Sequence, residues 1–293
     1  MKPIELKRIL VATDFLESSR LALDYAVALA HHFNAALILL HAIELSPFAQ
    51  EAEGVTRRPS VSRRATEERL EAFASGVRRT GLTVTTLIED GTPCQVIFNA
   101  VQSKMPDLLV LGVHGVHRGV AHLVIGSNTE KILLTVTCPT LSVGAHVLAG
   151  IDLDLKLNEI LYCSDLTPAA AAAARFAVFL GEEFHVPVDV CHLAPTPVEG
   201  NGSTPTKVAE DYCEALRRVL PGASEEWCTP AFHLKHSLGL DQILRRAETG
   251  AAGLIVLGVH TDTQLGRHVR TSLAYELLTK ASCPVLSIRG GRD

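Results

Sequence analysis

The chain contains an internal repeat, and this repeat restricts the possible folds more than any other sequence feature. Residues 8–14 match 159–165, residues 108–114 match 254–260, and residues 138–143 match 283–288, at offsets of 151, 146 and 145 residues. Matched blocks in one order indicate two copies of a single domain. We place copy one at residues 1–146 and copy two at residues 157–293, with a short linker between them.

Length and composition describe an ordinary globular protein of two domains. The 293 residues are about twice a usual domain length, and 47% of them are hydrophobic against 20% charged. A net charge of -5 argues against general binding to nucleic acids or anionic membranes, which requires a basic surface. Apolar runs fall short of the roughly 20 residues that span a bilayer. The segment before Asp14 is too short for a signal peptide, so we expect a cytoplasmic protein.

Both copies alternate strand-like and helix-like segments. In copy one the predicted strands are 9–13, 36–43, 82–89, 108–111 and 140–143, and the predicted helices are 18–32, 62–80, 93–103 and a last one from Ser127. Copy two repeats the pattern, with a strand ending at Cys163, a helix at 168–184 and a strand at 187–193. The sequence therefore predicts an α/β fold, with two tandem, doubly wound domains that each hold a five-stranded parallel sheet. Ligands of such domains lie at the carboxyl ends of the strands.

A glycine-containing segment follows the fourth predicted strand of copy one. We expect this strand to stop at Gly112, and the segment then continues through Gly115 to Gly126 and Ser127, where a helix begins. Glycines allow the backbone to turn sharply and to approach a ligand, and a helix start favours an anion. The pattern thus indicates a phosphate-binding loop; the alternative is a tight turn and a helix cap without a ligand.

The spacing G-x-x-G, ten residues, G-S, followed by a helix, Cys138-Pro139 and a last strand, resembles the universal stress protein family. The resemblance covers both copies and identifies a tandem, two-domain member with a Rossmann-like fold similar to the adenine nucleotide alpha hydrolases. It implies that the loop of copy one holds the ribose and triphosphate of ATP, accompanied by Mg²⁺. The family usually has nine residues where this loop has ten, and the extra residue either bulges out or disturbs the site.

The resemblance also assigns the site residues. Asp14 would face the nucleotide, although the alternative is a helix N-cap, and Thr13 ends the first strand, where it either contacts the ligand or only packs. Ala42 would offer its backbone to the adenine. The ribose and phosphates would be surrounded by Gly112, His114, Gly115, Gly126, Ser127 and Asn128.

Copy two differs from copy one in this loop. Thr261 and Thr271 replace the second and third glycines, and Asp262 adds a negative charge. We therefore expect ATP in copy one only. A basic cluster, Arg267, His268 and Arg270, is either a solvated loop, an interdomain contact or a site for a smaller anion.

The sequence shows no nucleophile–base pair and no metal-binding cluster, so we assign no catalytic and no metal-ligating residues. The seven cysteines form no C-x-x-C pair, and we interpret them as reduced and structural. Three functions remain open: a regulatory, stress-response protein that binds ATP with little or no hydrolysis, an interaction scaffold that has lost nucleotide binding, and a slow ATP hydrolase.

The last strands, 140–143 and 285–288, are short and apolar. Because an unpaired strand edge promotes association, we predict that the two copies pack face to face through these strands as a pseudo-twofold pair. A homodimer of the whole chain is a further possibility.

Overall fold

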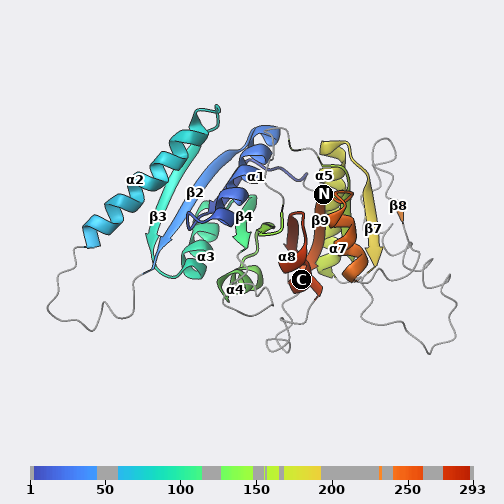
Figure 1. The fold of residues 1–293 in the computed structure, drawn as a ribbon. Helices are drawn as coiled ribbons and strands as arrows, with labels where there is room; N and C mark the ends of the chain where they lie inside the picture. The colour runs from blue at the N-terminus through green and yellow to red at the C-terminus, as the bar shows by residue number, and fades with distance from the viewer. Residues whose placement is uncertain are drawn as a thin grey trace.

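The computed structural model is one mixed sheet with helices on both faces (Figure 1). It describes residues 3–44, 59–113, 127–147, 155, 157–164, 168–192, 231–232, 240–259 and 273–290. Among these residues, no helix is both long enough and apolar enough to cross a membrane.

Strands and helices alternate in copy one as predicted. Copy one contains β1 (Arg8–Ala12), α1 (Glu17–Phe33), β2 (Ala36–Ile43), α2 (Pro59–Arg78), β3 (Val84–Asp90), α3 (Pro93–Lys104), β4 (Leu108–Val113), α4 (Ser127–Thr135) and β5 (Thr140–Gly144). Copy two contains β6 (Ile160–Ser164), α5 (Pro168–Phe184), β7 (Val188–His192), β8 (Ala231–Phe232), α7 (Leu240–Glu248), β9 (Leu254–Val259), α8 (Leu273–Lys280) and β10 (Val285–Arg289). The bounds predicted for copy one lie within three residues of these. The end predicted for β4 is wrong, because the strand continues through Gly112 to Val113.

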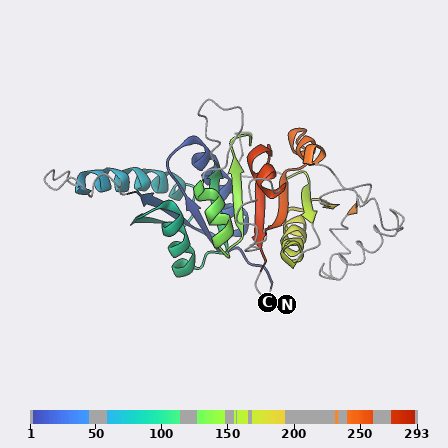
Figure 2. The ribbon, with the colours of Figure 1, turned by 90° about the horizontal axis from the view of Figure 1, so that it is seen from below.

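The predicted fold class is confirmed, but the two predicted sheets are halves of a single sheet. The ten strands follow the order β3-β2-β1-β4-β5-β10-β9-β6-β7-β8. All neighbours within each copy are parallel, and β5 pairs with β10 in the antiparallel direction. Figures 1 and 2 show the copies on either side of this central pair.

The central pair corrects one prediction and confirms another. Leu141 of β5 lies opposite Leu286 of β10, at the centre of a pseudo-twofold arrangement. The copies therefore meet through their last strands, as predicted. They meet edge to edge and not face to face, because edge pairing provides hydrogen-bond partners for the backbone N–H and C=O groups that each strand would otherwise leave open.

The sheet interior explains the continuous apolar runs. Ile9, Leu10 and Val11 of β1 are all fully buried, because helices cover both faces of the sheet. Ile9 and Val11 belong to the hydrophobic cluster that contains α1, whereas Leu10 belongs to the cluster that contains α3. The first cluster spans both copies, so the two domains share a core.

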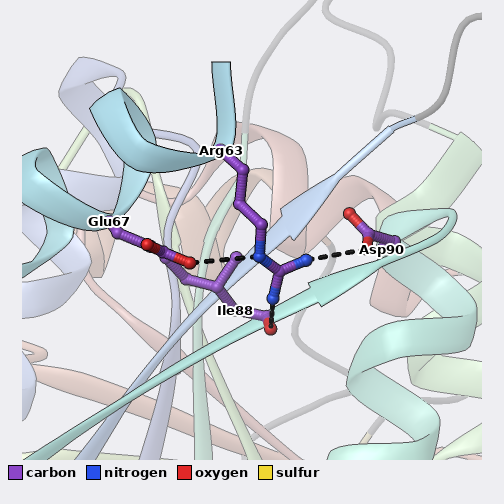
Figure 3. Close-up of polar contacts among 4 residues, drawn as sticks. All are labelled: Arg63, Glu67, Ile88 and Asp90. Carbon is purple, nitrogen blue, oxygen red and sulfur yellow. Dashed lines mark hydrogen bonds and ion pairs between the residues drawn. The ribbon is translucent and has the colours of Figure 1, made fainter. Parts of the chain in front are cut away.

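The outer edge of copy one is fastened by Arg63 of α2 (Figure 3). Its guanidinium donates to the carbonyl oxygen of Ile88 at 3.1 Å, to the Asp90 carboxylate at 2.7 Å and to the Glu67 carboxylate at 3.0 Å. Asp90 is the last residue of β3, directly before the turn into α3. Arg63 thus fixes α2 at the carboxyl edge of the sheet.

Candidate functional site

A pocket of about 310 Å³ opens at the carboxyl edge of copy one, where β1, β2 and β4 end. The chain proceeds from β1 to β2 and β3 in one direction and to β5 through β4 in the other, so this is the point where the strand order reverses. The lining residues are Ala12, Thr13, Asp14, Ser19, Leu40, His41, Ala42, Pro93, Ile97, Leu111, Gly112, Thr129 and Ile132. The volume lies at the lower end of the range for small-molecule sites.

Four predicted site residues, Thr13, Asp14, Ala42 and Gly112, line this pocket together. His114, Gly115 and Gly126 lie outside the described residues, as does the threonine-containing loop of copy two with its basic cluster. Ser127 and Asn128 form the first turn of α4.

Several lining residues were missed by the sequence interpretation. Pro93 and Ile97 come from α3, and Thr129 and Ile132 come from α4. Spacings of four and three residues place each pair on one helix face, which is a usable signal. The sequence does not say which helix face turns toward the ends of the strands, because that depends on the strand order.

Thr13 is buried and its hydroxyl stabilises the turn after β1. The hydroxyl accepts from the backbone N–H of Phe15 at 3.0 Å and lies 3.1 Å from the Ser19 hydroxyl. Because Ser19 donates its own proton to the carbonyl oxygen of Leu16, Thr13 is the donor between the two hydroxyls. The side chain of Thr13 therefore orders the turn, and the residue also lines the pocket.

Asp14 lies at the pocket rim with its side chain exposed. Its Oδ1 accepts from the backbone N–H of Leu16 at 2.9 Å, which forms a turn just before α1. The N-cap of α1 is Leu16, and no side chain caps it. Asp14 is thus not the helix N-cap that formed the alternative interpretation, and its carboxylate borders the pocket.

His41 links β2 to the turn after β1. Its Nδ1 lies 2.7 Å from the carbonyl oxygen of Thr13, which can only accept, so Nδ1 carries a proton. The imidazole ring also packs against Phe15, with 4.5 Å between ring centroids. Phe15 has a φ of 65°, an uncommon value for a residue with a side chain. The guanidinium carbon of Arg69 lies over the Phe15 ring, 4.4 Å from its centroid. These contacts hold the Thr13–Leu16 turn in one shape.

Ala42 presents its backbone to the pocket. In a parallel strand the N–H and C=O of one residue point to the same neighbour, and successive residues alternate. The carbonyl oxygen of Leu40 accepts from Thr13, on the β1 side, whereas that of Ile43 accepts from Gly91, on the β3 side. Ala42 therefore faces the β1 side, beyond the end of that strand at Ala12. One donor and one acceptor point toward the space at the strand end.

Gly112 has a role that the sequence interpretation did not recognise. A Cβ at this position would lie 2.5 Å from the backbone carbon of Ser18 and 2.5 Å from the backbone nitrogen of Ser19. The first turn of α1 thus sits directly on Gly112. Gly258 of copy two has the same relation to Ala169, where the distance would be 2.4 Å. The repeated glycine is explained by close packing of a helix on a strand, without any ligand.

Four of the five described cysteines are unreactive because they are buried. All five are free, and four are buried: Cys138, Cys163, Cys191 and Cys283. Burial raises the pKa of Cys138, Cys191 and Cys283 to about 12, and it raises the pKa of Cys163 well above its ordinary value. Such thiols lack the thiolate needed for nucleophilic attack. The described residues contain no group of His, Cys, Asp or Glu side chains arranged to hold a metal ion.

In copy two, different side chains lie at the strand positions that correspond to Ala12 and Leu40 of the copy one pocket. Cys163 and Cys191 are register partners on β6 and β7, as Ala12 and Leu40 are on β1 and β2. Two thiol groups thus replace a methyl and an isobutyl group beneath the carboxyl edge. The two copies share a backbone arrangement but differ in the side chains beneath the carboxyl edge.

Comparison with known proteins gives matches over both copies. The model of the Universal stress protein family matches residues 5–144 and 156–289. A universal stress protein of Methanocaldococcus jannaschii is 27% identical over 139 residues, covering 47% of this chain and 81% of that protein. One of Thermus aquaticus is 33% identical over 144 residues, covering 47% of this chain and 98% of that protein.

A solved structure matches both copies at once. The crystal structure of a universal stress protein from Archaeoglobus fulgidus has a TM-score of 0.70 and 17% identity, covering 97% of this chain and 98% of that chain. At this level of identity the likeness concerns the fold. It extends over both halves of the central sheet.

Proposed function

Because this chain belongs to the universal stress protein family, we propose that copy one binds ATP and that the protein has a regulatory, stress-response role with little or no hydrolysis. The observation that supports this proposal is the orientation of Ala42. Its N–H and C=O face the pocket side by side, and adenine carries the complementary pair, an acceptor at N1 and a donor at its amino group.

The remaining lining residues suit a nucleoside. The walls contain apolar side chains from α3, α4 and the strands, among them Ile97, Ile132 and Leu111, which suit the faces of a purine ring. Asp14 at the rim suits a ribose hydroxyl, because a carboxylate accepts hydrogen bonds. The phosphates would then be held by Gly115 and Gly126 together with His114, Ser127 and Asn128.

Mg²⁺ would be bound mainly through the phosphates. Asp14 is the one carboxylate among the described lining residues, and a single carboxylate does not form a magnesium site by itself. The chain's own residues would orient the nucleotide, and Mg²⁺ would neutralise phosphate charge. In the described part of the pocket no side chain pairs a nucleophile with a base, which is why we propose binding and not turnover.

The experiment that tests the proposal is titration calorimetry with ATP and with ITP. The base of ITP carries a donor at N1 and an acceptor at O6. It therefore inverts the donor and acceptor positions that would face the Ala42 backbone, and it leaves the ribose and phosphates unchanged. We expect one ATP per chain and affinity for ITP lower by a factor on the order of ten, the effect of leaving buried polar groups unpaired. Equal affinity for both nucleotides would refute the role of Ala42.

The other two functions appear as distinct outcomes. A folded protein that neither retains ATP in native mass spectrometry nor binds it in calorimetry would be the interaction scaffold. Phosphate release over many turnovers would identify an ATP hydrolase. Two equivalent ATP molecules per chain would show that the threonines in the copy two loop do not block the nucleotide.

A further inference from the structure

We infer that copy two positions the nucleotide pocket of copy one by holding helix α4, and that Arg289 is the residue through which it does so. This inference rests on the proposed function of copy one. It assigns to copy two a role that needs no ligand of its own.

Helix α4 connects the pocket with the other copy. Thr129 and Ile132 line the pocket, and Ile132 packs in the hydrophobic cluster of copy one that contains α3. The next residue, Leu133, belongs instead to a cluster made almost entirely of copy two side chains, including Tyr275 and Leu278 of α8. Adjacent residues of one helix thus belong to the cores of different copies.

The carboxyl end of α4 is held by a side chain of copy two. The Nη1 of Arg289, in the last position of β10, donates to the carbonyl oxygen of Thr135 at 2.7 Å. Thr135 is the last residue of α4, and helices leave their final carbonyl groups without partners in the helix itself. A cation at this end also interacts favourably with the helix dipole. Arg289 therefore fixes the end of α4 by a hydrogen bond and by its charge.

Strand β4, which precedes α4 in the chain, packs in the same copy two cluster as α4. Val113, the last residue of β4, is buried and lies in the same copy two cluster as Leu133. Both elements that flank residues 114–126 therefore depend on the packing of copy two. A displacement of α8 or β10 would shift the Thr129 and Ile132 wall of the pocket.

The arrangement is not symmetric. At the offset of 145 residues that relates β5 to β10, the counterpart of Arg289 is Gly144, which has no side chain to hold α8. The carbonyl oxygen of Leu278 would lie 3.5 Å from a Cβ at Gly144, so α8 packs close to the backbone there. Copy two thus holds the end of α4 with a side chain, whereas copy one offers α8 only backbone at the corresponding position.

The test compares Arg289→Gln with Arg289→Lys and Arg245→Gln in the full chain. Arg245 is exposed on α7, so its replacement removes the same charge from copy two without touching α4. We expect ATP affinity to fall about five-fold in Arg289→Gln, at the lower end of usual coupling between sites. Arg289→Lys, which keeps a donor and a charge, should restore most of the affinity, and Arg245→Gln should match the wild-type chain.

Hydrogen exchange without nucleotide gives the second measurement. The amide of Val136 donates to Ile132 at 2.9 Å in the last turn of α4, and it should exchange faster in Arg289→Gln than in Arg245→Gln. Unchanged exchange there would overturn the inference whether or not ATP binds. Faster exchange with unchanged ATP affinity would overturn the positioning role. If the wild-type chain does not bind ATP, the proposed function fails, and the exchange of α4 still decides whether copy two holds this helix.

Discussion

Replacing Gly112 by alanine tests the close packing of α1 on β4. The added Cβ would lie 2.5 Å from two backbone atoms, of Ser18 and Ser19, and 2.6 Å from the carbonyl oxygen of Ser18. Ordinary contacts between a Cβ and backbone heavy atoms begin at about 3.5 Å, so the helix must move by about 1 Å. Backbone atoms cannot rotate away as a side chain can. The helix start, and with it the Thr13–Leu16 turn, has to shift.

The magnitude follows from two opposing effects. Overpacking a well-filled interior lowers the free energy of unfolding by about 1–3 kcal/mol. Alanine also restricts the unfolded chain relative to glycine, which raises stability by about 0.4–1 kcal/mol. The contact is with backbone, so we take the upper half of the overpacking range and expect a net loss of about 2 kcal/mol. Gly258→Ala should behave alike, because its Cβ would lie 2.4 Å from Ala169.

Urea unfolding monitored by circular dichroism measures this loss, and Gly76→Ala is the matched control. Gly76 lies inside α2, and a Cβ there would approach only the Arg79 guanidinium, at 3.8 Å. The same substitution should raise stability at this position by about 0.5–1 kcal/mol, because glycine disfavours a helix interior. If Gly112→Ala unfolds at the same urea concentration as the wild-type chain while Gly76→Ala gains stability, the reasoning about Gly112 is wrong.

Three further predictions concern charge and pH. Arg246 of α7 pairs with Glu159 and with the buried Asp189, so Arg246→Met should lower the free energy of unfolding by about 3 kcal/mol at pH 7. Burial raises the pKa of Glu159, and without the arginine this carboxyl group is easier to bury protonated, so the loss should shrink in urea titrations as pH falls toward 4. The buried thiols of Cys138, Cys191 and Cys283 hold their protons in the folded chain up to about pH 12, whereas the unfolded chain releases them above about pH 8.5. Stability should therefore fall with rising pH above that value, and Cys138→Ala should reduce the slope by about 1.4 kcal/mol per pH unit. Arg63→Met should cost less than about 1 kcal/mol in thermal unfolding, since the Arg63 side chain and its carboxylate partners are 40–52% exposed; a larger loss would mean that the contact shown in Figure 3 organises more of the carboxyl edge than its exposure implies.

The sequence alone determined the repeat, the order of elements and the edge of the sheet at which the pocket opens. These features are local or periodic: continuous apolar runs such as 108–111 mark strands covered on both faces, and helix faces recur every three to four residues. The carboxyl ends of parallel strands must meet at one edge, which brought Thr13, Asp14, Ala42 and Gly112 together correctly. The family pattern added an expectation about ATP.

Tertiary structure decided what depends on contacts between distant segments. Gly112 was assigned to a ligand because a glycine after a strand suits both a turn and a close approach, and only the position of α1 shows that a helix backbone occupies the space beside it. The edge-to-edge pairing of β5 with β10 likewise follows from strand geometry that an apolar run does not encode. The link from Arg289 to Thr135 spans 154 residues, and no local pattern marks it. A contact of this kind arises only when the sheet has brought the two copies together.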